Sequence, residues 1–275
     1  MRLSSKTQLT TIGLLLAGAA SGAIAENSGG FRGPQRNGIF VTTGLMKKWP
    51  EGGPKLLWEA GVGKGWTAAS VADGKVFFFR GAGAVWADTG EKFWVDPTVK
   101  VKNRGQVQIV SNEGYIFLHG TVMAKIGRDG KIAPLWEGKV RISEYNISYS
   151  HTIIKDGRLF AFTPAGAVNP TAPGKVQMLD AETGAELSSL PCAAKGALAL
   201  ADGMLYLLDN RPGMVLIEVT KDSLREVCSF RPPLGKYATG SGVQLFTHPV
   251  IAEGRLFLRD QSKVLVYDLR KALAP

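Results

Sequence analysis

The sequence has few of the residues that build metal centres and disulfide frameworks. It contains two cysteines, Cys192 and Cys228, and three histidines among 275 residues. Two cysteines 36 positions apart do not make a disulfide-rich scaffold, and the histidines lack the close His, Cys or Asp spacing of a zinc site. We therefore predict no metal site. Because the cysteines fall at dissimilar places in the repeats described below, we expect two free, largely buried thiols.

Compact catalytic signatures and long apolar runs are also absent. No nucleophile elbow or phosphate-binding loop occurs, so no catalytic residue is predicted. The most apolar stretch is the beginning, where Arg2 and Lys6 precede a short apolar core and Ala23-Ile24-Ala25 precedes Glu26. This core is too short to span a membrane comfortably. Residues 1–25 are predicted to be a signal peptide, and no cysteine lies near the cleavage position to carry a lipid, so the mature protein is expected to be periplasmic or secreted, with no membrane span.

Positive charge dominates the sequence. The formal net charge is +10, and loss of Arg2 and Lys6 leaves 31 basic against 23 acidic residues, a net charge of +8. Such a charge favours anionic surfaces such as phospholipid, lipopolysaccharide or acidic glycans. A nucleic-acid partner would need a basic stripe interleaved with aromatic residues, and we do not expect one for an exported protein.

A short pattern recurs five times. In its clearest copy, residues 151–162, an apolar run leads to an acid, a glycine, one further residue, an aliphatic residue and an aromatic residue. The repeated glycines are Gly74, Gly114, Gly157, Gly203 and Gly254, preceded by Asp73, Glu113, Asp156, Asp202 and Glu253. The aromatics three positions later are Phe77, Phe117, Phe160, Tyr206 and Phe257. Each copy predicts a β-hairpin, because an acid–glycine pair between apolar runs favours a tight turn in which glycine takes a positive φ.

The spacing of the copies predicts the architecture. Successive glycines are 40, 43, 46 and 51 residues apart. Repeats of this length built from strands are typical of four-stranded propeller blades and not of helical solenoids. We therefore predict an all-β fold, a β-propeller of about five blades, placed near 66–95, 106–136, 149–190, 195–230 and from 246 onward. The alternative is a β-sandwich whose turns coincide by chance.

The last blade has room for only three strands before the chain ends. A predicted strand at residues 54–59, whose apolar part, residues 56–58, ends in tryptophan, precedes the first blade and is expected to supply the fourth strand. This pairing closes the ring and removes both exposed sheet edges. The predicted organisation is thus a signal peptide (1–25), an irregular N-terminal arm (26–52) and a propeller (53–275).

These residues resemble the quinoprotein repeat of PQQ-like propeller proteins. The resemblance lies in the turn at 180–184, in Trp58, Trp94 and Trp136, and in the acid–glycine hairpins. The segments FRGPQRNG (31–38), GLMKKWPEGGPKLLW (44–58) and HPVIAEGRLFLRDQ (248–261) are similar to exported bacterial members, and the resemblance covers about residues 31–270. Members have about seven or eight blades, which implies a shortened ring here or degenerate strands within 97–105, 137–148 and 231–245.

The resemblance implies a cofactor only for part of the family. Quinoprotein dehydrogenases commonly carry two adjacent cysteines beneath the quinone, and this sequence has none. We therefore expect no cofactor. A PQQ- and calcium-dependent alcohol or sugar dehydrogenase stays the alternative function.

A ligand site is predicted where the innermost strands begin, at the mouth of the channel. Counting back six or eight positions from each repeat glycine selects Trp66, Gln108, Tyr149, His151, Lys195, Phe246 and His248. Aromatic, histidine and polar groups around an apolar recess suit a sugar or small ligand. In the alternative, these aromatics pack between blades and the histidines satisfy backbone groups.

The sequence thus predicts an exported, non-catalytic β-propeller that binds a protein partner or an envelope glycan on its loop-rich face. At the level of fold, the analogy is with the propeller subunit of the outer-membrane barrel-insertion machinery, which shares the repeat without using quinone. Fold alone does not assign function.

Overall fold

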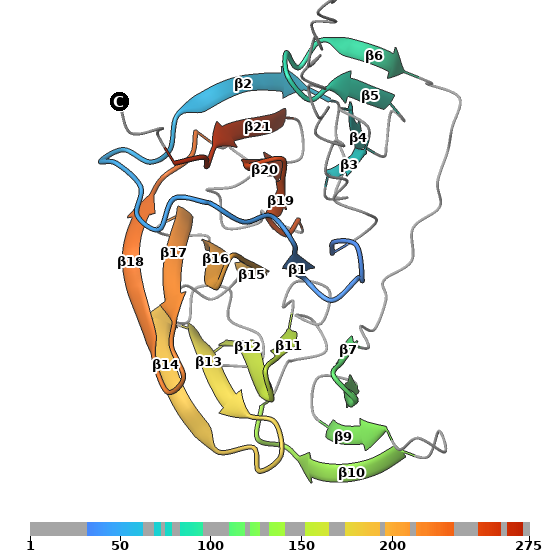
Figure 1. Ribbon diagram of the computed structural model, residues 1–275, viewed down its shortest axis with the longest axis vertical. Coiled ribbons are helices and arrows are strands. Elements are labelled where there is room, and N and C mark those ends of the chain that lie inside the picture. The colour runs from blue at the N-terminus through green and yellow to red at the C-terminus, as the bar shows by residue number, and fades with distance from the viewer. Residues whose placement is uncertain are drawn as a thin grey trace, which may run out of the picture.

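The computed structural model describes residues 32–62, 69–72, 75–78, 83–95, 110–118, 122–126, 132–140, 152–164, 174–192, 196–209, 213–233, 247–259 and 263–271. Within these ranges the chain is all-β, with 21 strands and no helix, as predicted. The strands form one five-stranded and four four-stranded sheets. Figure 1 shows the sheets arranged around a common centre, with the first strand of each predicted blade facing the centre and the last at the periphery.

The sheets follow one another in chain order, and each contains one copy of the repeat. The first sheet comprises β3 (Ser70–Ala72), β4 (Lys75–Phe78), β5 (Gly83–Trp86) and β6 (Lys92–Val95). The second comprises β7 (Val110–Asn112), β8 (Tyr115–Leu118), β9 (Val122–Ile126) and β10 (Ile132–Glu137). The third comprises β11 (Ile153–Lys155), β12 (Arg158–Pro164), β13 (Gly174–Asp180) and β14 (Glu186–Cys192).

The last two sheets also take strands from the beginning of the chain. The fourth sheet comprises β15 (Gly196–Ala201), β16 (Met204–Asp209), β17 (Gly213–Val219) and β18 (Leu224–Phe230), with β1 (Ile39–Phe40) added beside β15. The fifth comprises β19 (Val250–Ala252), β20 (Arg255–Arg259), β21 (Lys263–Asp268) and β2 (Leu56–Gly61). All pairings are antiparallel except that of β1 with β15.

The acid–glycine pairs form tight hairpin turns. In the four described copies both turn residues have positive φ: 53° and 78° at Glu113–Gly114, 52° and 67° at Asp156–Gly157, 49° and 72° at Asp202–Gly203, and 53° and 68° at Glu253–Gly254. Two successive positive φ angles define the type I′ turn, whose twist matches that of the flanking strands. The hairpin prediction is confirmed for these four copies, and the pair at 73–74 lies outside the described residues.

Every outer strand carries a β-bulge at the same place. The pairing register skips Leu57, Phe93, Leu135, Leu187 and Val227, and the residues that follow are Trp58, Trp94, Trp136, Ser188 and Cys228. A bulge re-aims the side chain that follows it. Trp58 Nε1 donates to the carbonyl of Ala87 at 2.8 Å, and Trp136 Nε1 donates to that of Ala181 at 2.9 Å. Two tryptophans thus tie their own sheet to the next one.

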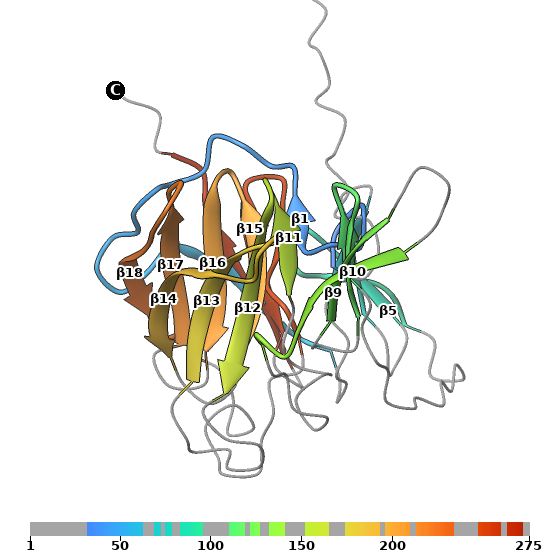
Figure 2. The same cartoon turned by 90° about the horizontal axis from the view of Figure 1, so that it is seen from below.

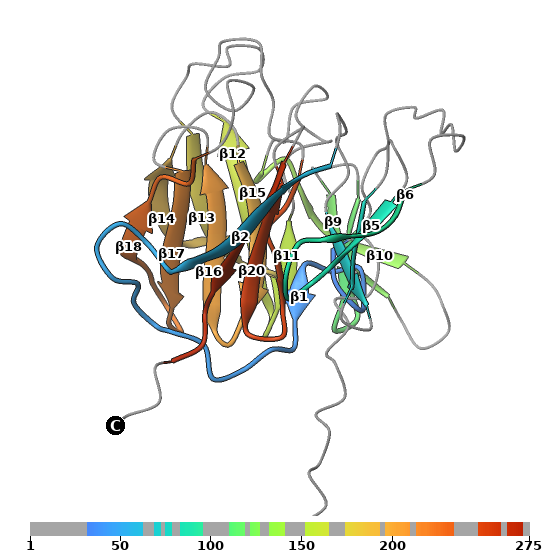
Figure 3. The ribbon, with the colours of Figure 1, turned by 90° about the horizontal axis from the view of Figure 1, so that it is seen from above.

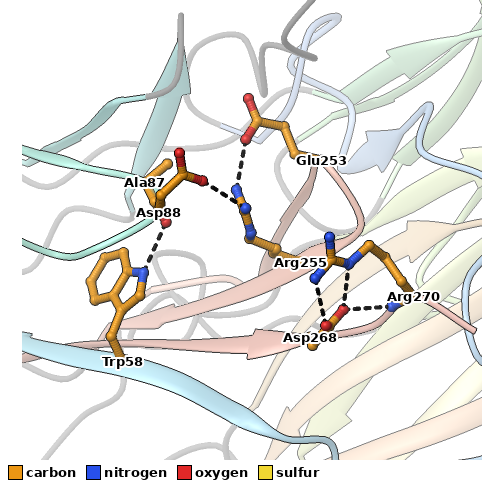
Figure 4. A network of polar contacts seen from close by, with 7 residues as sticks. All are labelled: Trp58, Ala87, Asp88, Glu253, Arg255, Asp268 and Arg270. Carbon is orange, nitrogen blue, oxygen red and sulfur yellow. Dashed lines mark hydrogen bonds and ion pairs between the residues drawn. The ribbon is translucent and has the colours of Figure 1, made fainter. Parts of the chain in front are cut away.

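The predicted pairing of the leading segment with the last sheet is present. Strand β2 pairs with β21 from Leu56–Tyr267 to Gly61–Lys263. Figure 4 shows how this sheet meets the first one: Arg255 donates to Asp88 at 2.7 Å and to Glu253 at 2.9 Å, beside the Trp58 bond. The fifth sheet is therefore joined to the first by polar contacts as well as by packing.

The arm is more ordered than the prediction of an irregular segment. Strand β1 runs parallel to β15, with Ile39 opposite Leu200 and Phe40 opposite Ala201, near the centre in Figure 1. After β1 the blue segment crosses one end of the sheets in the side views of Figures 2 and 3. We call this end, which carries the acid–glycine turns, the hairpin end. Two residues of parallel strand leave no periodic signal, which is why the sequence did not predict them.

Hydrophobic clusters fill the contacts between neighbouring sheets. One cluster joins the first, fourth and fifth sheets and the arm, a second joins the third and fourth, and a third joins the second and third. The arm contributes Trp49, which packs edge-on against Phe230 with ring centroids 5.3 Å apart and lies 6.1 Å from the Tyr206 ring.

Candidate functional site

Most of the predicted channel-mouth site lies outside the described residues. Of the seven predicted residues, the structure describes only His248; those outside are Trp66, Gln108, Tyr149, His151, Lys195 and Phe246. The predicted signal peptide, residues 1–25, lies outside them as well. The place of His248 is therefore what the structure adds to this prediction.

His248 is buried and is engaged by the arm. It is 2% exposed, its Nε2 accepts a hydrogen bond from the Arg32 backbone N–H at 3.1 Å, and its ring stacks with Phe40 at 6.4 Å between centroids. Burial, with a smaller contribution from the Arg32 charge, lowers the pKa of His248 to about 3, so the imidazole is neutral at physiological pH. At this position, residues of the N-terminal arm pack against His248 near the centre of the sheets.

Arg32 is a buried cation whose guanidinium donates to carbonyl oxygens among the described residues. Its guanidinium donates to the carbonyls of Asn37, at 3.3 Å, and Thr152, and its side chain forms no ion pair within the described chain. Arg32 is 2% exposed, and burial lowers its pKa to about 10. Removing a charge from water without an opposite charge is costly, so a second cation is disfavoured beside Arg32.

The turn before β1 requires glycine at position 38. Gly38 donates its N–H to the Arg32 carbonyl at 2.8 Å and has a φ of 82°. A Cβ on Gly38 would lie 2.8 Å from Arg32 Nη2 and 3.0 Å from Ile153 Cγ1. Only glycine combines this φ with so close an approach.

The seam between the third and fourth sheets breaks the tryptophan pattern. Here Ser188 takes the position after the bulge, and its Oγ accepts from the Leu224 N–H at 3.0 Å. The next seam has Cys228 at this position, whose Sγ accepts from the Trp49 N–H at 3.2 Å, so a tryptophan from the arm packs there. No equivalent tryptophan from the described residues packs against Ser188.

A half-open pocket of about 530 Å³ lies in this seam at the hairpin end. We call it the seam pocket. Its lining comes from the arm (Ile39 and Phe40), the β11–β12 hairpin (Lys155, Asp156, Arg158 and Phe160) and the fourth sheet (Leu200, Ala201, Asp202, Gly203, Val219, Thr220 and Lys221). Its volume is within the range of ligand sites. Phe40 and Phe160 are only 3% and 1% exposed, so they form a closed floor, while Ile39 and Val219 are half-buried.

Both acids of the seam pocket are already paired with lysines. Lys47 Nζ lies 2.9 Å from Asp202 Oδ2, which also accepts from the Leu45 N–H at 3.0 Å. Burial alone raises the pKa of Asp202, but these two bonds outweigh it and hold the pKa below its usual value. Lys155 donates to Asp156 and, at 2.9 Å, to Glu113, and these bonds raise the pKa of Lys155.

Two other cationic residues of the pocket, Arg158 and Lys221, form no ion pair among the described residues. Arg158 lies on the wall from the third sheet and Lys221 on the wall from the fourth. The side chain of neither residue forms a hydrogen bond or ion pair in the part of the chain that the structure describes, although the charge of Arg158 helps to lower the pKa of Asp180. Arg158 lies opposite Asp180 in the sheet, but the Asp180 carboxylate accepts from Thr183 N–H at 2.8 Å and from Thr183 Oγ1 at 2.9 Å. The pocket is therefore lined by two cationic side chains, one from each sheet, that form no ion pair within the described residues.

The sequence alone does not reveal the seam pocket, because the signal for it depends on the strand register. The residues that follow the bulges read Trp, Trp, Trp, Ser and Cys, and the pocket lies at the serine seam. The bulges are not visible in the sequence, so serine and tryptophan could not be aligned without the strand register.

The structure bears on predicted metal sites and membrane spans only for the residues that it describes. There, no group of three or more His, Cys, Asp or Glu side chains is placed to bind a metal ion. No helix with the length and hydrophobicity of a membrane span occurs among the same residues. Cys192 and Cys228 are free, and each is partly buried, whereas the sequence predicted largely buried thiols.

Comparison with known proteins adds distant likenesses only. No protein-family model and no curated protein matches the chain. The structure of quinohemoprotein alcohol dehydrogenase ADHIIG from Pseudomonas putida HK5 is 14% identical with a TM-score of 0.36, over 82% of this chain and 43% of that one. BamB from Moraxella catarrhalis is 11% identical with a TM-score of 0.31, over 75% of this chain and 70% of that one. Apo AztD from Citrobacter koseri is 14% identical with a TM-score of 0.37, over 72% and 60%.

Thus the chain spans less than half the length of the dehydrogenase that it matches. At these identities and TM-scores, the similarities do not assign an activity, a ligand or a partner to the chain.

Proposed function

We propose that the chain is an exported, non-catalytic β-propeller that binds a protein partner, and that the seam pocket is part of the binding surface. In this proposal the five sheets are the blades, and β2 closes the ring by completing the fifth. The pairing of β2 with β21 and the contacts of Arg255 with Asp88 support closure. Export rests on the predicted signal peptide.

The observation that carries the binding role is the seam pocket itself. It is a recess with an apolar floor, charged rims and half-buried aliphatic side chains at Ile39 and Val219. A glycan site would need accessible aromatic faces and several uncharged hydrogen-bonding groups to orient a polar ligand. Phe40 and Phe160 expose almost no surface, and Thr220 is the one uncharged polar side chain of the lining. A protein segment suits this surface better than a sugar does.

The same residues support a role without catalysis or cofactor. A calcium ion bound near the centre would face the charge of Arg32, which forms no ion pair within the described chain and opposes a second cation. His248, the one described residue of the predicted mouth, is committed to the arm by its bond from Arg32. Among the described residues, therefore, the groups at the centre do not fit a calcium–quinone site.

Site-specific photocrosslinking tests the binding role. A benzophenone side chain at Val41, which is 65% exposed beside the seam pocket, should capture a discrete partner from cell-envelope extract. The matched control places the same group at Trp86, 40% exposed on the first sheet, where we expect no adduct. Filling the pocket by Val219→Trp should abolish the adduct at Val41. Equal adducts at both positions, or no effect of V219W, would contradict the proposal.

A dye-reduction assay distinguishes the proposed binding role from the alternative, a quinone-dependent dehydrogenase. The mature protein is incubated with quinone and calcium and then supplied with alcohols and aldoses. We expect no turnover above the cofactor alone. Stoichiometric quinone binding with turnover would contradict the non-catalytic role and show that the protein is a dehydrogenase.

A further inference from the structure

We propose that the seam pocket recognises an extended, acidic segment of a protein partner, with a carboxylate between Arg158 and Lys221 and apolar side chains against Ile39 and Val219. The inference rests on the proposed function, since it names the chemistry of the ligand at the same pocket. It adds two specificity-determining residues that no motif in the sequence identifies.

The balance of charge in the pocket selects an anion. Asp156 and Asp202 are each bound by a lysine, so neither is available to attract a ligand cation. The side chains of Arg158 and Lys221 form no ion pair within the described chain, and both line the same recess, one from the third sheet and one from the fourth. A carboxylate between them would accept charge-assisted hydrogen bonds, and the planar guanidinium of arginine suits bidentate contact with a carboxylate.

The inner end of the seam already holds an extended peptide, which is the arm. Gly38 accepts a hydrogen bond from Leu200 N–H at 2.9 Å, and Ile39 and Phe40 lie in register beside β15. The chain thus shows that an extended backbone fits between the third and fourth sheets. A partner segment would continue outward from Ile39 over the remaining open part of the pocket, a form of recognition that combines backbone fit with side-chain pockets.

Apolar surface for the flanking side chains is present on the same rim. Ile39 and Val219 are half-buried in the pocket, and Val41 follows the arm strand with 65% of its surface exposed. Val41 is one of four large apolar residues that are exposed to solvent among the described residues. An acidic residue flanked by aliphatic residues would place its carboxylate at the cations and its neighbours on this surface.

Peptide selection on the whole mature protein tests the inference. A phage-displayed library of random heptapeptides is selected against the protein, and enriched peptides are synthesised with each acid kept or replaced by its amide. We expect enrichment of Asp or Glu beside aliphatic residues, and about tenfold weaker binding for each amide peptide. Arg158→Gln and Lys221→Gln should each weaken the acidic peptide about tenfold and leave the amide peptide unaffected.

Matched controls keep the test specific. Arg36→Gln and Lys48→Gln remove the same charges from exposed positions that do not line the pocket, and should leave affinity unchanged. Circular dichroism melting of each variant excludes unfolding as a cause. Equal affinity of the acid and amide peptides, or equal loss in the control variants, would overturn the inference.

The remaining outcomes separate the inference from the proposed function. If the Val41 crosslink captures a partner while R158Q and K221Q leave it unchanged, the binding role stands and the acidic ligand is wrong. If no peptide is enriched and anionic phosphatidylglycerol vesicles bind in a manner that R158Q and K221Q abolish, the cations serve a membrane surface and the peptide proposal fails.

Discussion

At the residue scale, positive φ and close approach set the role of Gly90. Its φ is 74°, and a Cβ at this position would lie 2.6 Å from Trp58 Cε3. Gly90 belongs to the turn of the first sheet, whereas Trp58 lies on β2 of the fifth. A single methyl group here therefore disturbs both the turn and the joint between the two sheets.

We predict that Gly90→Ala destabilises the protein by more than its backbone cost. The left-handed conformation alone costs an L-residue about 1–2 kcal/mol, and displacement of the indole adds to this. Gly52→Ala is the matched control, because Gly52 has a φ of 81° and nothing within 4 Å of an added Cβ. Urea unfolding should show a larger loss for G90A than for G52A, and equal losses would mean that Trp58 yields without cost.

The buried His248 predicts a dependence of stability on pH. Its pKa is about 6.5 when unfolded and about 3 when folded, so the unfolded state binds the extra proton between these values. Stability is therefore complete above pH 6.5 and declines as the pH falls towards 3. The linkage relation gives a loss of about 1.4 kcal/mol between pH 7.5 and 5.5.

Replacement by glutamine isolates this titration. His248→Gln keeps an acceptor for the Arg32 N–H but cannot be protonated, so its free energy of unfolding should fall less between pH 7.5 and 5.5 by that amount. Urea titrations of both proteins at the two pH values measure the difference. Parallel pH profiles for the two proteins would show that His248 is solvated and not buried against the arm.

The sequence could predict residue types at this scale, but not their partners. The sequence places His248 just before an innermost strand, and it lies two residues before β19, yet its partner Arg32 is 216 positions away in a segment without periodicity. The hydrogen bond depends on where the arm enters the centre, and no local pattern in either segment carries that information.

At the scale of the element, the tryptophans that follow the bulges join neighbouring sheets. The Trp136–Ala181 bond is buried, whereas the Trp58–Ala87 bond is partly exposed. A donor lost from a buried carbonyl costs more than one lost where water can replace it.

We predict that Trp136→Phe destabilises the protein by about 1–3 kcal/mol and Trp58→Phe by less. Phenylalanine keeps most of the ring packing and removes the N–H donor. Urea unfolding gives both values, and amide exchange at Gly184, in the turn that Trp136 contacts, should quicken in W136F alone. A larger loss in W58F would reverse the assigned roles of the two bonds.

Elements with a strong local signal could be predicted, and the weak ones could not. The acid–glycine hairpins combine turn chemistry with flanking apolar runs, so their places follow from local sequence. Strand β1 has two residues and takes its structure from β15, which is a tertiary effect. The bulges are likewise defined by the partner strand, which is why the seam with Ser188 was not recognised.

At the scale of the whole molecule, the position of β2 decides how the sheets are joined. Its sequence precedes the first sheet, but it pairs with the last one, so the fifth sheet depends on residues about 200 positions apart. This could be predicted, because the last repeat lacks a strand and the leading segment ends in tryptophan like the outer strands of the first two sheets. The route of the arm through the centre could not, since it depends on packing alone.

We predict that deletion of residues 53–61 abolishes the cooperative unfolding transition. The deletion exposes the edge of β21 and removes Trp58, so both the fifth sheet and its joint with the first lose their contacts. A synthetic peptide of residues 53–61, added in excess, should restore the transition by pairing with β21, whereas a scrambled peptide should not. The transition is followed by circular dichroism against urea. A truncated protein that unfolds as cooperatively as the full chain would contradict this prediction. It would mean that the remaining sheets and the arm are stable without β2, and that the pairing of β2 with β21 is not needed to join the fifth sheet to the first.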